Sequence, residues 1–286
     1  MKFALVDGQR QEAKRNLSGY CPACGSAMVP RCGDVRVNHW AHRGRRECDP
    51  WWESETEWHR AWKGKFPKDW QERIHQAESG EKHIADVKTD QGWVLEFQHS
   101  YMDPDERRAR EHFYQKLVWI VDGARRQRDT QQFFKALHDG ELVDVDNGIR
   151  RVPLSNRCAL LRDWAGSRAA ILFDFCEHRE PDETHLALFG SSGGSNSEDT
   201  HLWWLVQVID EKAYLLPFGR AEFVVYHSPD AARKDPVFGD LLSKYRAFAG
   251  YIARPHEHRP PNQFEAALHL REQLFGKLRS TRRTPL

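Results

Sequence analysis

The chain has 286 residues and a formal net charge of +1, because 43 Lys and Arg residues face 42 Asp and Glu residues. This near-neutral balance excludes a polycation that binds nucleic acid through its overall charge, so such affinity must come from local basic patches. A hydrophobic content of 40% allows a buried core, and no apolar run reaches the length of a membrane span. The length suggests one large domain or, more commonly, two.

The cysteines and the first residues of the chain indicate in which cellular compartment the protein works. Six cysteines are present, and four of them lie among the first fifty residues. Charged residues come too early for a secretory signal peptide. We therefore expect a cytoplasmic, reducing setting with no membrane partner, where clustered cysteines favour metal binding over disulfides.

Residues 1–50 have the pattern of a small zinc module. Cys21 and Cys24 form a C-x2-C pair, and His39 and His42 form an H-x2-H pair after fourteen intervening residues. This spacing is close to that of Cys₂His₂ zinc sites, and Gly25 suits the turn in which backbone amides point at a thiolate. We predict a structural zinc ion with these four ligands. Two further cysteines compete for a ligand position: Cys48 and, less strongly, Cys32.

A helix is predicted over residues 51–65, with Pro50 as its start signal and Gly64 and Pro67 as its stop signals. Glu55, His59 and Lys63 are four residues apart and therefore share one face of this helix. Such a face is most often simply solvated. Glu57, on a different face, is the alternative acidic candidate.

Residues 71–76 form a plausible strand, and residues 83–98 read as two strands joined by a turn at Thr89–Gly92. Pairing of the two strands brings Asp86 roughly opposite Glu96, with Gln98 on the face of Glu96. Facing carboxylates repel unless they are neutralised, and a hard divalent cation such as Mg²⁺ or Mn²⁺ is the usual solution. A solvent-facing polar strand is the alternative explanation.

The next predicted elements are a helix over Pro104–Lys116 and a strand over Leu117–Val121. The helix carries Arg107 and Arg110 on one side. The strand is continuously apolar, as expected of a strand buried on both faces, and a crossover helix favours parallel pairing with its neighbour.

This order of motifs resembles the core of PD-(D/E)XK nucleases, and residues 20–122 more closely resemble the competence protein CoiA-like nucleases of that superfamily. The similarity covers somewhat over a third of the chain, and Thr56 stands where the family commonly has Ser. It rests on linked motifs: C-P-x-C-G at 21–25, H-W-A-H at 39–42, E-T-E-W-H at 55–59 with Lys63, A-D-V at 85–87, E-F-Q-H-S at 96–100, and W-I at 119–120.

The resemblance implies an α/β fold, with a restriction-endonuclease-like mixed sheet flanked by helices. Asp86 and Glu96 would bind catalytic Mg²⁺ or Mn²⁺, while Gln98 would orient the attacking water. Gln98 departs from the more usual Lys and cannot lower the pKa of water as a cation does. The remaining implied roles are an outer metal site at Glu55, phosphate contact or acid–base chemistry at His59 and Lys63, and DNA-backbone contacts at Arg107 and Arg110.

Residues 151–286 are not placed by this resemblance and are expected to form a C-terminal α+β domain. Gly190–Asp199 reads as a Gly/Ser-rich loop. Four strands are predicted, over Ala169–Phe175, Leu202–Val208, Ala213–Phe218 and Glu222–Tyr226, followed by helices over Phe238–Phe248 and Gln263–Leu278.

The sequence thus predicts a zinc module over 1–50, a nuclease-like core over 51–150 and a third domain over 151–286. The expected function is a metal-dependent nuclease acting on DNA in competence, recombination, repair or phage defence. It would work alone, as a homo-oligomer or with other DNA-processing proteins. The main alternative is a non-catalytic nucleic-acid-binding or assembly protein. A hydrolase that uses the zinc ion itself is a third possibility, disfavoured because four protein ligands leave no open position.

Overall fold

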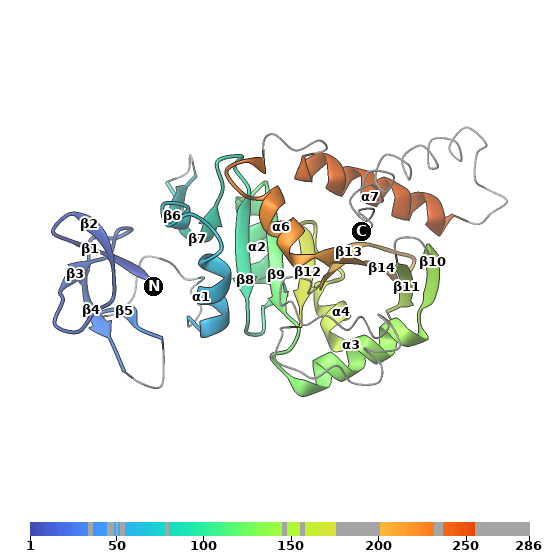
Figure 1. The fold of residues 1–286 in the computed structure, drawn as a ribbon, viewed down its shortest axis with the longest axis horizontal. Helices are drawn as coiled ribbons and strands as arrows, with labels where there is room; N and C mark the ends of the chain where they lie inside the picture. The colour runs from blue at the N-terminus through green and yellow to red at the C-terminus, as the bar shows by residue number, and fades with distance from the viewer. Residues whose placement is uncertain are drawn as a thin grey trace, which may run out of the picture. The chain divides into compact units, whose positions relative to one another are not determined.

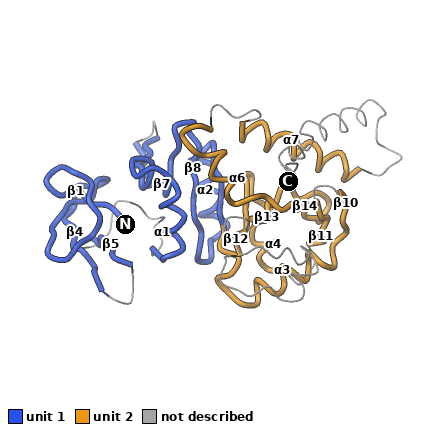
Figure 2. The backbone as a smooth tube through the Cα atoms, in the orientation of Figure 1, with its two compact units in different colours: residues 1–120 blue, residues 121–286 orange. Residues whose placement is uncertain are grey.

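The computed structural model describes residues 1–33, 37–44, 49, 51, 55–77, 80–144, 148–154, 158–175, 201–231 and 237–254. The chain divides into two compact units, Met1–Ile120 and Val121–Leu286, which are coloured separately in Figure 2. Each unit is described by itself. Within the described part of the chain, no helix combines the length and apolar character needed to cross a membrane.

The N-terminal part of unit 1 is an antiparallel five-stranded sheet with strand order β2-β1-β3-β4-β5. Its first hairpin turns at Asp7 and Gly8, whose φ angles of 50° and 78° are those that a two-residue turn of this kind requires. Ala4, Met28 and Trp40 are buried in its core. The strands are β1 Phe3–Val6, β2 Gln9–Glu12, β3 Gly19–Tyr20, β4 Ala27–Arg31 and β5 His39–His42 (Figure 1).

The rest of unit 1 contains four strands in the order β9-β8-β7-β6, of which β6–β7 and β7–β8 are antiparallel pairs. The amide of Val94 donates to the carbonyl of Lys116 over 2.8 Å, so β8 and β9 begin at the same end of the sheet, as parallel neighbours do. The predicted strands are present, and every residue of β9 is buried. The strands are β6 Gln71–Gln76, β7 Lys82–Lys88, β8 Val94–Gln98 and β9 Leu117–Asp122.

The two helices of unit 1 are shorter than predicted. Helix α1 spans Glu57–Lys63 because Thr56 caps it: its side chain accepts from the amide of His59, and the His59 ring accepts from the amide of Thr56. Glu55 therefore precedes the helix. Helix α2 spans Pro104–Phe113 and ends before the predicted Lys116.

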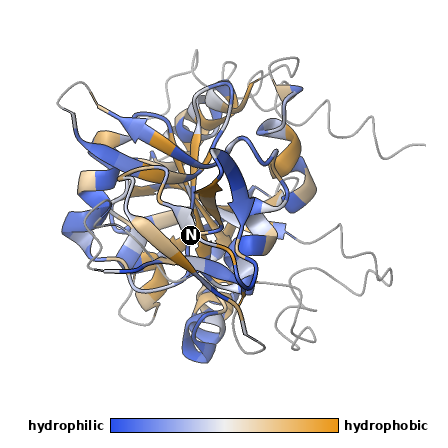
Figure 3. Ribbon diagram, turned by 90° about the vertical axis from the view of Figure 1, so that its left-hand side faces the viewer, coloured by the Kyte–Doolittle hydropathy of each residue, from blue (hydrophilic) through white to orange (hydrophobic). Residues whose placement is uncertain are grey.

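Unit 2 has strands in the order β10-β11-β14-β13-β12. In its core Trp204 stacks on Phe238 with ring centroids 5.4 Å apart. Figure 3 shows hydrophobic colouring in strands near the centre of the view and hydrophilic colouring on several surrounding helices and turns. The elements are α3 Gln127–Asp139, β10 Glu141–Asp144, β11 Ile149–Pro153, α4 Ala159–Trp164, β12 Ala170–Asp174, β13 His201–Ile209, β14 Lys212–Gly219, α6 Arg220–Tyr226 and α7 Phe238–Ala253.

One prediction in unit 2 is wrong: residues 222–226 are part of helix α6 and not a strand. The β-branched pair Val224 and Val225 favours a strand locally, but this preference is weak, and packing of the fully buried Phe223 overrides it. Three predicted strands and the helix that begins at Phe238 are present. The predicted loop over Gly190–Asp199 and the predicted helix over Gln263–Leu278 lie outside the described residues.

Candidate functional site

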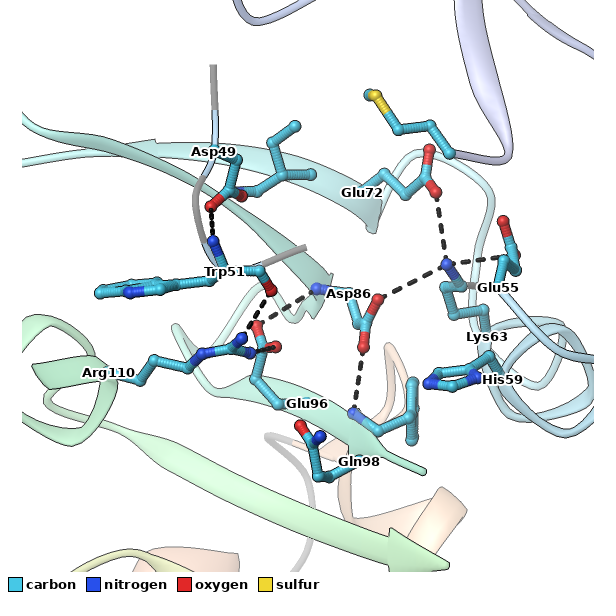
Figure 4. A pocket seen from close by; sticks show the side chains of 13 residues that line it. Asp49, Trp51, Glu55, His59, Lys63, Glu72, Asp86, Glu96, Gln98 and Arg110 are labelled. Atoms are coloured by element: carbon cyan, nitrogen blue, oxygen red, sulfur yellow. Dashed lines mark hydrogen bonds and ion pairs between the residues drawn. The ribbon is translucent and has the colours of Figure 1, made fainter. Parts of the chain in front are cut away.

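A cavity of about 60 Å³ lies in unit 1, where α1, α2 and strands β6, β7 and β8 come together (Figure 4). Its described lining carries more acidic than basic side chains. Five carboxylates face two permanently cationic groups there, so the lining has a surplus of negative charge. The acids are Asp49, Glu55, Glu72, Asp86 and Glu96, and the cations are Lys63 and Arg110.

Three of these acids form a row across adjacent strands. Glu96 on β8, Asp86 on β7 and Glu72 on β6 occupy successive facing positions, which follow from the register of the neighbouring pairs. Those pairs are Val87 with Leu95, Gln71 with Val87, and Arg73 with Ala85. The cross-strand meeting of Asp86 and Glu96 is the arrangement that the hairpin pattern predicts.

The Asp86 and Glu96 carboxylates interrupt the backbone ladder between their strands. Asp86 Oδ2 accepts from the amide of Phe97 at 3.0 Å, and Glu96 Oε1 accepts from the amide of Asp86 at 3.4 Å. Glu96 is buried, with 6% exposure. Burial raises its pKa well above the ordinary value and the Asp86 charge raises it further, against the opposing effect of Arg110. This site therefore favours a cation or a proton beside Glu96.

Lys63 lies between three of the five acids, Glu55, Glu72 and Asp86 (Figure 4). Its Nζ is 3.1 Å from Glu55, 3.3 Å from Glu72 and 3.5 Å from Asp86. Burial alone would lower the pKa of this amine, but the three carboxylates raise it above its ordinary value. Lys63 is therefore a permanently charged cation inside the pocket.

Glu72 is a pocket residue that the sequence did not single out. Its carboxylate accepts the amides of Lys2 at 2.6 Å and Phe3 at 3.0 Å, so it connects β6 with the beginning of β1. Burial opposes its ionisation, but the charges of Lys63 and of the N-terminal amine, together with these two amides, lower its pKa to about 2. Its φ of 48° is unusual for a residue other than glycine and is the kind of strain that tends to occur at functional sites.

Asp49 is a second pocket residue that the sequence did not single out, because it lies in no regular element. Its carboxylate accepts the amides of Trp51 at 3.0 Å and Ile84 at 2.9 Å. It also lies 3.1 Å from Nδ1 of His83, whose ring stacks on Trp51. His83 is thereby held against Asp49 and is not among the residues that line the cavity.

The other predicted side chains of the helix and hairpin also line the cavity. Glu55 reaches Lys63 although it precedes α1, and it lies 3.5 Å from Arg60. His59 is buried, and its Nδ1 lies 2.8 Å from the hydroxyl of Thr56. The Gln98 amide nitrogen donates to the Ser100 carbonyl at 3.2 Å, which directs the amide group along the loop that follows β8. Glu57 is exposed and does not line the cavity.

Arg107 and Arg110 are both buried. Arg110 Nη1 lies 3.3 Å from Glu96, while Nη2 donates to the Trp51 carbonyl at 2.5 Å and to Glu106. Arg107 lies 3.7 Å from Glu111 on the same helix. Arg110 is thus the cationic partner of the proposed metal ligand Glu96, a position that the helical spacing alone does not reveal.

A second group of potential ligands lies in the N-terminal sheet. Donor atoms of Cys21, Cys24 and His42 all lie within 4.8 Å of one another, so this group could hold a metal ion. Gly25 has φ of 72°, and its amide closes the turn on the carbonyl of Cys21 at 2.9 Å. Burial raises the pKa of the Cys21 thiol, whereas the amides of Cys24 and Ala23 lower it, which is the amide-to-sulfur contact expected of a zinc-binding turn.

His39 does not join this group. Both histidines lie on β5, and side chains three residues apart on a strand point to opposite faces. The His39 ring instead lies 2.9 Å from the carbonyl of Val37, to which its Nδ1–H donates. Cys32 is also not part of the described group, and Cys48 lies outside the described residues.

Comparison with known proteins bears on the N-terminal segment. Curated proteins and solved structures give no match to the chain. Residues 6–50 match the family model described as "Competence protein CoiA, N-terminal domain". This match includes Cys21, Cys24 and His42, so the N-terminal module is similar to the N-terminal domain of that family.

Proposed function

We propose that this protein is a metal-dependent nuclease with a PD-(D/E)XK-type core, and that DNA is its substrate. The observation that carries the proposal is the pair of the partly buried Asp86 and the buried Glu96 on adjacent strands, within a pocket whose described lining has a surplus of acids. Carboxylate oxygens are the hard ligands that Mg²⁺ and Mn²⁺ prefer. The raised pKa of Glu96 fits a group whose ionised form needs a cation beside it.

Each residue then has a definable task. Asp86 and Glu96 would hold the divalent ion, which when bound supplies Lewis-acid activation of water and charge neutralisation at the phosphoryl group. Arg110 would retain Glu106 and the Trp51 carbonyl as partners when Glu96 turns toward the ion. Glu55 would complete the outer part of the acidic group through its contact with Lys63.

Lys63 can supply the positive charge that is missing because Gln98 stands where PD-(D/E)XK nucleases more often have Lys. A glutamine on β8 orients water but supplies no charge, whereas Lys63 places a permanent cation 3.5 Å from Asp86 from the side of α1. We propose that Lys63 stabilises the charge that develops on the phosphate, with Gln98 orienting the water and His59 assisting as an acid or base. The site would thus carry its lysine on the helix and not on the strand.

The N-terminal module is proposed to bind a structural zinc ion through Cys21, Cys24 and His42. Two cysteines of a tight turn and a histidine at the end of β5 are a donor set that suits Zn²⁺. A fourth ligand would come from elsewhere in the chain, with Cys48 as the candidate. A zinc content that is stoichiometric but unrelated to turnover would exclude the reading in which this ion is catalytic.

The family match of residues 6–50 supports DNA as the substrate, since competence concerns the uptake of DNA. The test is cleavage of plasmid and single-stranded DNA in Mg²⁺, in Mn²⁺ and in EDTA. We expect Glu96→Gln to lower cleavage by at least about 10³-fold, because the variant removes a metal-binding charge from the reacting centre. The matched control is Glu57→Gln, which changes an exposed acid of α1 and should retain activity. A wild type inactive in both metals would refute the proposal.

A non-catalytic nucleic-acid-binding protein is the second candidate. One observation favours it: Lys63 and Arg110 already neutralise part of the charge of the pocket carboxylates, so the pocket depends less on a bound metal ion. The same variants separate the two functions. DNA binding that Glu96→Gln leaves intact, in a wild type without cleavage, would favour the binding protein.

A further inference from the structure

The N-terminal strand β1 and the acidic pocket are joined through Glu72. The Glu72 carboxylate accepts hydrogen bonds from two backbone amides of the N-terminal module, that of Lys2 at 2.6 Å and that of Phe3 at 3.0 Å. Its Oε1 also lies 3.3 Å from Lys63 Nζ. The Lys2 side chain adds a 2.8 Å hydrogen bond to the neighbouring Gln71. Glu72 makes these contacts from a left-handed backbone conformation, with φ of 48°.

The distances around Lys63 show how its charge is shared. Nζ lies closest to Glu55 at 3.1 Å, next to Glu72 at 3.3 Å and farthest from Asp86 at 3.5 Å. Asp86 is the acid that the proposed function needs for a metal ion. Lys63 is ion-paired with Asp86 and would compete there with that ion, and its shorter contacts with Glu55 and Glu72 limit this competition.

We propose that Glu72 is a positioning residue that, fixed by the amides of Lys2 and Phe3, competes with Asp86 for Lys63 and so sets the affinity of the pocket for its divalent ion. The N-terminal module is then a structural part of the nuclease site as well as a zinc-binding element. This inference rests on the proposed metal site at Asp86 and Glu96. Without Glu72, the acidic partners that remain for Lys63 among the described residues are Glu55 and Asp86, and we expect Lys63 to move toward Asp86.

The experiment measures Mn²⁺ binding to the full chain by calorimetry, in wild type and in Glu72→Gln. We expect the variant to bind Mn²⁺ about tenfold more weakly, because the released lysine competes for Asp86. In a Lys63→Gln background, Glu72→Gln should change Mn²⁺ affinity by less than about twofold, since the competing cation is gone. A crystal structure of Glu72→Gln should show Lys63 Nζ closer to Asp86 Oδ1 than 3.5 Å.

We call the hydrogen bond from the residue 2 amide to the Glu72 carboxylate the clamp. A second pair of variants tests this clamp without changing a side chain that lines the pocket. Lys2→Pro removes the amide that donates to Glu72, whereas Lys2→Ala removes the side chain and keeps that amide. Residue 2 precedes β1, where proline is tolerated. Weaker Mn²⁺ binding in Lys2→Pro than in Lys2→Ala supports the clamp, and equal binding in the two overturns it.

The outcomes separate this inference from the proposed nuclease activity. Wild type that binds Mn²⁺ without cleaving DNA, with the predicted pattern in Glu72→Gln, supports the inference and refutes the nuclease. Active wild type with unchanged Mn²⁺ affinity in Glu72→Gln overturns the inference and leaves the nuclease. An equal loss of affinity with and without Lys63 also overturns it, since Glu72 would then act only through its own charge. Wild type that binds no Mn²⁺ overturns both.

Discussion

The two candidate metal sites of unit 1 differ in the burial and in the chemical type of their donor atoms. The Cys21–Cys24–His42 group lies on a turn and a strand end of a small sheet, with Cys24 exposed and soft sulfur and nitrogen donors. The acidic pocket lies among core strands, with buried oxygen donors and two cations already in place. A small module with few core residues gains stability from a bound ion, whereas strands that belong to a larger core can tolerate an unfavourable cluster of charge. This contrast is consistent with the structural role that we propose for the first site and with the catalytic role that we propose for the second.

Replacing Lys63, one of the two cations of the described pocket lining, is the strongest test of the role that we propose for this lysine. Lys63→Gln should lower kcat by about 10²–10³-fold, because it removes the positive charge near the reacting phosphate. Gln98→Ala should cost less, since Gln98 contributes orientation without charge. Steady-state kinetics on DNA with saturating Mn²⁺ give both values.

The rescue variant sharpens this test. If a lysine can act from strand β8 as well as from helix α1, the double variant Lys63→Gln/Gln98→Lys should recover part of the kcat that Lys63→Gln loses. A larger loss in Gln98→Ala than in Lys63→Gln would show that the strand residue, and not the helix lysine, carries the chemistry.

The histidine pair tests the other site. His42→Ala should weaken zinc binding by more than about 100-fold, because even the loss of a residue that only supports a ligand costs about 10–100-fold. His39→Ala, on the opposite face of β5, should keep its zinc. Elemental analysis after gel filtration measures both, and zinc loss in His39→Ala would restore it as a ligand.

The pH dependence of stability is the smallest expected effect and belongs to the pocket. The pKa of Glu96 is raised by burial and by Asp86, so the folded protein binds this proton more tightly than the unfolded chain does. Its contribution to the free energy of unfolding is therefore fully present below the unfolded pKa and is lost as pH rises through the folded pKa. Thermal unfolding without added divalent metal should show this loss in wild type and a flatter profile in Glu96→Gln. Parallel profiles for the two proteins would argue against a buried, proton-binding Glu96.

Sequence patterns predicted what depends on local periodicity. The turn at Thr89–Gly92 and strand alternation were enough to bring Asp86 opposite Glu96, and the apolar run at 117–121 was enough to predict a buried strand. Glu72 escaped prediction because its role depends on a positive φ and on the register of β6 with β7. A carboxylate on the strand preceding the hairpin was the available signal.

Other parts of the site depend on tertiary contacts that spacing does not encode. Asp49 reaches the pocket from an irregular segment, and Arg110 turns inward because Glu96 is buried beside it. His39 was grouped with His42 by spacing alone, but the segment is a strand, in which positions three apart diverge. The assignments of Asp86, Glu96, Gln98 and Lys63 to catalysis stay predictions until activity is measured.

The clamp between Lys2 and Glu72 also bears on how the molecule folds. It joins residues separated by 70 positions, and contacts this distant along the chain form late, because closing a long loop costs entropy before the contact is gained. During synthesis, the first strand has to wait for β6 to emerge before this hydrogen bond can form. We therefore expect the acidic pocket to mature as one of the last steps of folding, after the N-terminal sheet is complete.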